Sequence, residues 1–243
     1  KCYGYSPGST TYVERTDYAS DTTNSVRKGD LPSSTQYSRG QGNKDYGYSV
    51  ANEYSRSYVF RIDYGNDTAT AVTKGNLSKV YERFGTTGNA VGGYAAGGGP
   101  GVQSRVDRID YSNDTAISSP KGPLAVAVQE MSGVSASENG LPPTGPNFIP
   151  RVRFIDLELE GTGATPEIPE STAGPAYGYQ HGGDPGTTQV MRIDFSNDTA
   201  AASLKGPLQN GVVRHGGAGN LTHGYTFGGQ GYTHIHKVDY SND

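Results

Sequence analysis

The sequence contains no tryptophan, one cysteine and two methionines, and it has no long run of apolar residues. Because Cys2 is the single cysteine, the chain cannot form an intramolecular disulfide bond. No apolar stretch approaches the roughly 20 residues that a membrane-spanning helix requires. We therefore expect no membrane span.

Clustered charge of one sign is also missing. The 20 basic and 24 acidic residues give a formal net charge of -4, and like charges do not form long runs. A surface that binds phosphate backbones needs clustered lysine and arginine. We therefore predict that nucleic acid is not a partner.

Glycine and proline are abundant, with 36 and 14 residues, while hydrophobic residues make up only 33% of the chain. This composition, without an apolar period of 3.6 residues, disfavours helices. The 18 tyrosines and a regular internal repeat argue against disorder and for a packed, all-β domain.

The repeat centres on an aspartate that follows an aliphatic residue in five of six copies and precedes an aromatic residue in most. The six copies are Asp17, Asp63, Asp110, Asp156, Asp194 and Asp239, at spacings of 46, 47, 46, 38 and 45 residues. A β-branched residue stands four positions earlier and usually a cation two positions earlier, which predicts a strand with the cation and the aspartate on one face. The predicted structural pairs are Arg15 with Asp17, Arg61 with Asp63, Arg108 with Asp110, Arg192 with Asp194, and Lys237 with Asp239.

Other segments of the unit read as short strands that end in turn residues. A Gly/Tyr strand lies upstream of the aspartate, another segment ends in Gly-Asn (Gly42-Asn43, for example), and a last one ends in Lys-Gly. Four short strands in about 46 residues are typical of a propeller blade, with a β-solenoid as the alternative. We predict six four-stranded blades in a single repeat domain, with repeats at 1–31, 32–77, 78–124, 125–168, 169–208 and 209–243.

The two ends fall within the repeat, so we expect either a window of a longer repeat protein or a ring completed by another segment. The order of Gly228-Gly229 and the later strand at 236–240 resembles the kelch family of propellers, although kelch repeats carry a tryptophan and the opposite Asp–Tyr order. The string at 108–116, followed by Lys-Gly-Pro-Leu, is similar to repeat proteins of marine viruses and phages. The second resemblance implies a virion fibre or surface protein.

Hydrolytic chemistry needs a nucleophile beside a base, or two carboxylates in different environments. No such constellation stands apart from the repeat, so we predict a protein that is not an enzyme and has no cofactor. The repeated Asp and Asn oxygens resemble calcium ligands, but the EF-hand spacing is absent and turn capping is the favoured interpretation. His234 and His236 have a spacing compatible with zinc; we favour variable positions and predict no metal site.

Aromatic and histidine residues near the irregular loops are the binding candidates, because tyrosine offers an apolar face and a hydroxyl. The alternative is packing between blades. These candidates are Tyr94, Tyr177, Tyr179, His181, His234 and His236. The segments 137–150 and 161–175, where the repeat breaks down, are candidate binding loops. Candidate glycosylation sites, each an Asn-x-Ser/Thr sequon, are Asn66, Asn76, Asn113, Asn197 and Asn220.

The leading hypothesis is a structural or adhesive propeller on a virion or cell surface. Its partners would be other structural subunits, including further copies of itself, or a host glycan. An intracellular kelch-like interaction module is the second hypothesis, and a propeller glycosidase or lyase is the third.

Overall fold

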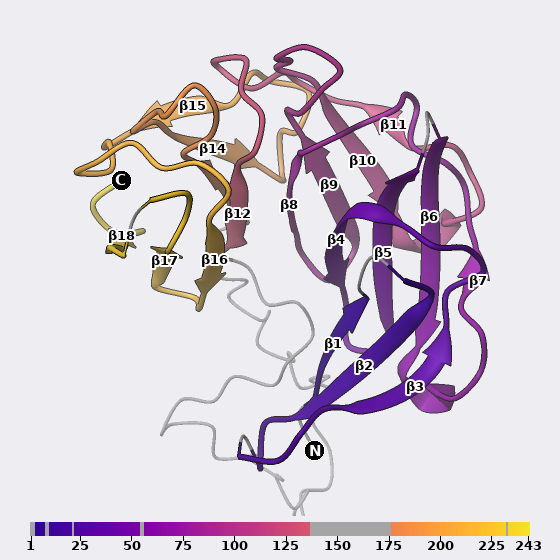
Figure 1. The fold of residues 1–243 in the computed structure, drawn as a ribbon. Coiled ribbons are helices and arrows are strands. Elements are labelled where there is room, and N and C mark those ends of the chain that lie inside the picture. The colour runs from indigo at the N-terminus through magenta and orange to yellow at the C-terminus, as the bar shows by residue number, and fades with distance from the viewer. Residues whose placement is uncertain (1–2, 8–9, 21, 54–55, 137–175, 232) are drawn as a thin grey trace, which may run out of the picture.

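The computed structural model describes residues 3–7, 10–20, 22–53, 56–136, 176–231 and 233–243. Five antiparallel sheets follow one another in chain order and form an arc around a common centre (Figure 1). In these residues the helical elements are two short 3-10 turns, η1 (Tyr64–Asn66) and η2 (Tyr111–Asn113). The prediction of an all-β propeller is therefore confirmed. The described residues form five blades rather than the predicted six, and three of these have four strands while two have three.

Within each sheet the strands are hydrogen-bonded in chain order. The first sheet contains β1 (Tyr3–Pro7), β2 (Tyr12–Asp17) and β3 (Val26–Asp30). The second contains β4 (Gln36–Gly42), β5 (Tyr46–Glu53), β6 (Arg56–Asp63) and β7 (Val72–Thr73). The third contains β8 (Gly85–Gly88), β9 (Gly92–Ala96), β10 (Val106–Asp110) and β11 (Ser119–Pro120). The fourth contains β12 (Ser132–Ser135), β13 (Tyr177–His181), β14 (Val190–Asp194) and β15 (Ser203–Lys205), and the fifth contains β16 (Gly216–Gly219), β17 (His223–Phe227) and β18 (Ile235–Asp239).

The fourth sheet explains why the prediction of six blades is wrong. Its first strand comes from the predicted repeat 125–168 and its other three strands come from the predicted repeat 169–208. β12 and β13 are direct neighbours, with Ser135 opposite Gly178. The aspartate at 156, which suggested a separate repeat, lies outside the described residues, as do Cys2 and the loops at 137–150 and 161–175.

The inner strands β4, β8, β12 and β16 face the centre of the arc (Figure 1). They are rich in glycine because neighbouring strands approach closely there. A Cβ atom on Gly133 would lie 2.3 Å from the carbonyl oxygen of Thr86, and one on Gly217 would lie 2.4 Å from Oγ of Ser132. Side chains at these positions would push the inner strands apart.

The hydrophobic core is divided among the four junctions between neighbouring sheets. At the junction of the second and third sheets, for example, Val59 and Leu77 pack with Phe84 and Ile109. All five residues of β9 are buried, which follows from a sheet that is covered on both faces by its neighbours. This arrangement explains how a chain with few aliphatic residues still forms a core.

The predicted Gly-Asn turns connect the first and second strands of three sheets. The side-chain oxygen of Asn43 accepts hydrogen bonds from the backbone N–H groups of Asp45 and Tyr46, and Asn89 and Asn220 make the same pair of bonds in their sheets. Asparagine suits this position because its side chain replaces a backbone acceptor in a tight turn.

Candidate functional site

Neighbouring sheets are joined by a repeated clasp, in which one buried carboxylate receives three side chains from the preceding sheet. Asp114, after β10, is 7% exposed. Its Oδ2 accepts hydrogen bonds from Oη of Tyr48 (2.9 Å) and Nη1 of Arg61 (2.8 Å), and Nζ of Lys74 lies 3.0 Å from its Oδ1. The equivalent sets are Tyr5, Arg15 and Lys28 on Asp67; Tyr94, Arg108 and Lys121 on Asp198; and Tyr179, Arg192 and Lys205 on Asp243.

The clasp keeps its carboxylate ionised although it is buried. Desolvation alone would raise the pKa of Asp114, but hydrogen bonds from Lys74 and Tyr48 and the charge of Arg61 outweigh it. The pKa therefore lies below its ordinary value. Asp67 shows the same balance.

The predicted pairing of each cation with the aspartate on its own strand is corrected by this geometry. The four arginines pair instead with the acid of the next sheet, four residues beyond the repeat aspartate. The repeat aspartates cap turns: their Oδ1 atoms accept the backbone N–H two residues later. These aspartates are Asp17, Asp63, Asp110, Asp194 and Asp239. Lys237 on β18 is exposed.

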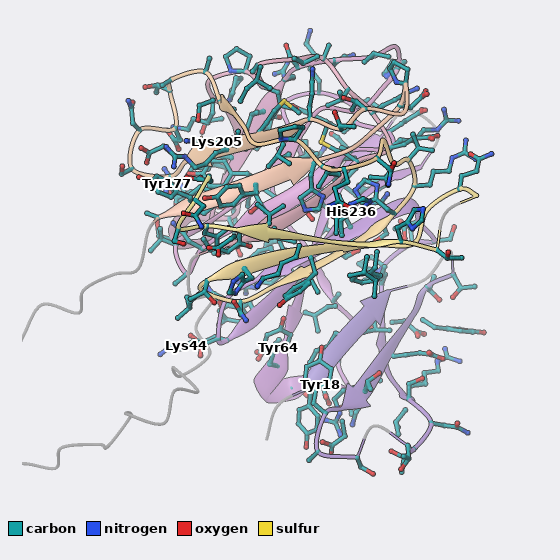
Figure 2. The ribbon with its side chains drawn as sticks, turned by 90° about the vertical axis from the view of Figure 1, so that its left-hand side faces the viewer. Tyr18, Lys44, Tyr64, Tyr177, Lys205 and His236 are labelled. Carbon is teal, nitrogen blue, oxygen red and sulfur yellow. The ribbon has the colours of Figure 1, made fainter. Side chains whose placement is uncertain are left out.

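Two of the tyrosines predicted to bind a ligand are part of this framework. Tyr94 and Tyr179 are buried, and their rings stack on Phe195 and Tyr240 of the next sheet at centroid distances of 4.8 and 4.5 Å. Tyr64, labelled in Figure 2, makes the same stack with Tyr5. Tyr177 lies at a different place, with the guanidinium of Arg192 4.1 Å from its ring centroid. The stacks of Tyr94 and Tyr179 therefore show packing between sheets, whereas the contact of Tyr177 with Arg192 lies within the fourth sheet.

The histidines predicted as binding candidates lie in two places, His181 beside His215 and His234 beside His236. His181 is fully buried, and its Nδ1 lies 2.8 Å from Oγ1 of Thr226 and 3.3 Å from Nε2 of His215. Burial, with the nearby His215, lowers the pKa of His181 to about 3, and burial lowers that of His215 to about 4. His236 (Figure 2) is buried and His234 is exposed, with ring centroids 6.2 Å apart. Among the described residues, no three metal-ligating side chains are placed to hold an ion.

A cavity of about 580 Å³ lies at the centre, where the inner strands meet. Four charged residues line it, and three of them have a positive φ: Arg83 (54°), Glu130 (56°) and Arg214 (54°). They precede β8, β12 and β16 at equivalent positions. Residues other than glycine rarely adopt this conformation, and such strain clusters at functional sites.

These three residues form a connected rim. The backbone N–H of Glu130 donates to the carbonyl of Arg83 (2.5 Å), and that of Arg214 donates to the carbonyl of Glu130 (3.0 Å). The Arg214 guanidinium binds the Glu130 carboxylate through Nε (2.7 Å) and Nη2 (3.0 Å), and Nε of Arg83 lies 3.5 Å from the same carboxylate. One acid is thus held between cations of two neighbouring sheets.

The fourth charged residue of the cavity, Arg39 on β4, breaks the repeat. By strand register its position is equivalent to Gly85, Ser132 and Gly216 in the other inner strands. Its Nη1 donates to the carbonyl of Ser38 (3.1 Å), and no described carboxylate lies within ion-pair distance of it. Burial lowers the pKa of this guanidinium.

None of these four charged residues was identified from the sequence. Two signals in the sequence could have identified them. Arg39 stands where other copies have glycine or serine, and a charged residue recurs two positions before the inner strand, as Arg83, Glu130 and Arg214. The inner strands are the most variable part of the repeat, so their alignment becomes clear only with the strand register.

The five sequon asparagines are all exposed. The side-chain oxygens of Asn66, Asn113 and Asn197 accept hydrogen bonds from the threonine two residues later. Their position in exposed turns leaves room for a glycan.

A comparison with protein-family models finds no match, and neither does one with curated proteins. Within the described ranges, no helix has the length and apolar character needed to cross a membrane.

Proposed function

We propose that this protein is a non-enzymatic adhesive propeller, exposed on a virion or cell surface, that presents loops and its central cavity to a partner protein or a host glycan. A further copy of the chain or another structural subunit is a partner of the same kind. The sheets provide a rigid scaffold, and the residues that differ between repeats provide the binding surface.

The observation that carries this proposal is the separation of repeated from unrepeated chemistry. The repeated Asp, Arg, Lys and Tyr side chains are engaged in clasps, turns and stacks, as the set around Asp114 illustrates. The two charges that depart from the repeat, Arg39 and Glu130, both line the central cavity, beside Arg83 and Arg214. A cavity whose charged residues differ between repeats, on a scaffold that is otherwise regular, favours a ligand-binding role over a purely structural one.

Exposure on a surface is supported by two further features. All five sequon asparagines lie in exposed positions, where a secretory glycan would not disturb the core. The repeat string at 108–116 is similar to that of virion proteins, which favours the surface of a particle over the interior of a cell.

The experiment is to measure retention of the full chain on a panel of immobilised glycans and, in parallel, the release of reducing ends from soluble polysaccharides. Retention without release supports an adhesive protein, whereas release would show a glycosidase or lyase. Surface labelling of the natural particle or cell tests the location. A protein found only inside the cell, with a protein partner, would favour the kelch-like interaction module instead.

A further inference from the structure

We propose that the central cavity is an oxyanion site, and that it takes the carboxylate or sulfate group of a small, hydroxyl-rich acidic ligand. The oxyanion chemistry comes from the cavity itself. The expectation that the ligand is a saccharide rests on the proposed function.

The charge balance of the cavity favours an anion. Among the described residues of the lining, Arg39, Arg83 and Arg214 are positively charged, and Glu130, which is the acid among them, pairs with Arg83 and Arg214. His215 also lines the cavity, but its pKa of about 4 keeps it neutral at physiological pH. The positive charge that no described acid offsets is therefore that of Arg39.

Arg39 is the residue that most needs a partner. A guanidinium remains protonated in proteins, and a charge in a partly desolvated site is costly unless it is paired. Burial is the one cause that shifts its pKa, so among the described residues no acid offsets this cost. The planar guanidinium matches two oxygens of a carboxylate or sulfate in one bidentate contact.

The size and lining of the cavity indicate the rest of the ligand. A volume of about 580 Å³ falls in the range of small-molecule sites. Apart from the charged residues and the histidine, the described residues of the lining are glycine, serine and threonine, including Thr86 and Ser132, without tyrosine or phenylalanine. Hydroxyls and backbone groups suit a hydroxylated ligand, whereas a nucleotide base would lack an aromatic surface on which to stack.

Titration calorimetry of the full chain at constant ionic strength tests the proposal with four probes: glucuronate, glucose, acetate and sulfate. We expect glucuronate to bind more tightly than acetate or sulfate, and glucose to show no binding. R39Q should weaken glucuronate binding at least about tenfold, because one charged hydrogen-bonding group is lost. R27Q on β3 is the matched control, since Arg27 pairs with Asp30 on the outside of the first sheet, and it should bind like the wild type.

R214Q, at a more exposed rim position, provides a second variant if R39Q fails to fold, and it should also weaken binding. Equal weakening by R27Q, or binding of none of the oxyanions at millimolar concentration, would overturn the site. A different result would contradict the saccharide ligand alone. If sulfate and acetate bind as tightly as glucuronate, the oxyanion site is supported, but an acidic saccharide is not its ligand. If R39Q is still retained on the glycan panel, the protein is adhesive, but its glycan-binding site lies outside the central cavity.

Discussion

At the scale of the residue, two aspartates only four positions apart in the repeat have different roles. Asp110 is exposed and caps a turn, whereas Asp114 is buried and forms ion pairs with two cations of the preceding sheet. We expect Asp114→Asn to lower the free energy of unfolding by about 3 kcal/mol, because Arg61 and Lys74 would keep their buried charges without a carboxylate. Urea denaturation monitored by circular dichroism measures this loss.

Asp110→Asn is the matched control, four residues away and with the same change of chemistry. Asparagine still accepts the turn hydrogen bond, so the cost should stay below about 1 kcal/mol. Equal losses in the two variants would contradict the structural role of the clasp.

The buried histidines predict a second effect at this scale, on pH dependence. The pKa of His181 is about 3 and that of His215 about 4, both below the value of 6.5 in an unfolded chain. As the pH falls below 6.5, these histidines bind protons in the unfolded state but not in the folded state, so the free energy of unfolding decreases. Each histidine should contribute a loss of about 2 kcal/mol between pH 7 and pH 5.

His181→Gln isolates one of the two contributions, since glutamine does not titrate. Urea denaturation at pH 7 and pH 5 should show about half of the wild-type loss in this variant. An unchanged loss would mean that His181 is already protonated in the folded state at pH 5.

At the scale of the element, the Lys-Gly step at the end of each unit fixes the distance between sheets. The backbone N–H of Gly75 donates to the carbonyl of Asp114 (2.8 Å), and a Cβ on Gly75 would lie 1.8 Å from the carbonyl oxygen of Ala116. Gly75→Ala should therefore destabilise the fold by about 3 kcal/mol, because backbone atoms cannot give way without separating the sheets.

Gly186→Ala is the control, because Gly186 is an exposed glycine in the loop between β13 and β14. Nothing lies within 4 Å of its added Cβ, so its unfolding free energy should stay within about 0.5 kcal/mol of the wild type. The difference between the two urea midpoints measures the steric contact itself. If both variants lost stability equally, conformational entropy rather than contact would explain the glycine.

The elements themselves were predictable because their signals are local. A β-branched residue, an alternating cation and a closing turn lie within one strand, and the asparagine of the Gly-Asn turn acts within three residues of itself. The partners of those cations were not predictable in the same way. Arg61 and Asp114 are brought together by the packing of two sheets, which no spacing within one unit reveals. For the same reason Arg39 and Arg214 could not be assigned to one cavity.

At the scale of the whole molecule, residues 151–157 explain the sixth predicted blade. They place Val152, Ile155 and Asp156 at the repeat spacing, and three matching residues are too short a pattern to define a repeat by themselves. Other signals pointed the other way: Phe154 replaces the arginine, Leu157 replaces the aromatic residue, and no Lys-Gly step follows. The clasp decides the count, because Arg108 and Lys121 of the third sheet pair with Asp198 in the sheet that contains β12.

This assignment predicts that residues 137–176 are an insertion that the scaffold does not need. In the second, third and fifth sheets two residues separate the positions equivalent to Ala136 and Tyr177, and the backbone N–H of Ala136 already donates to the carbonyl of Tyr177 (3.0 Å).

The test is a shortened variant in which asparagine replaces Ala136 and Lys-Asp replaces residues 137–176, as in the β4–β5 turn. The variant should unfold in one cooperative transition with an unfolding free energy within about 1 kcal/mol of the wild type, since loop length changes stability only slowly. R39Q should weaken glucuronate binding in this shortened chain as in the full one, because the shortened chain keeps every described residue that lines the cavity. Loss of the cooperative transition would instead mean that the replaced segment holds a sheet of its own, which would restore six blades.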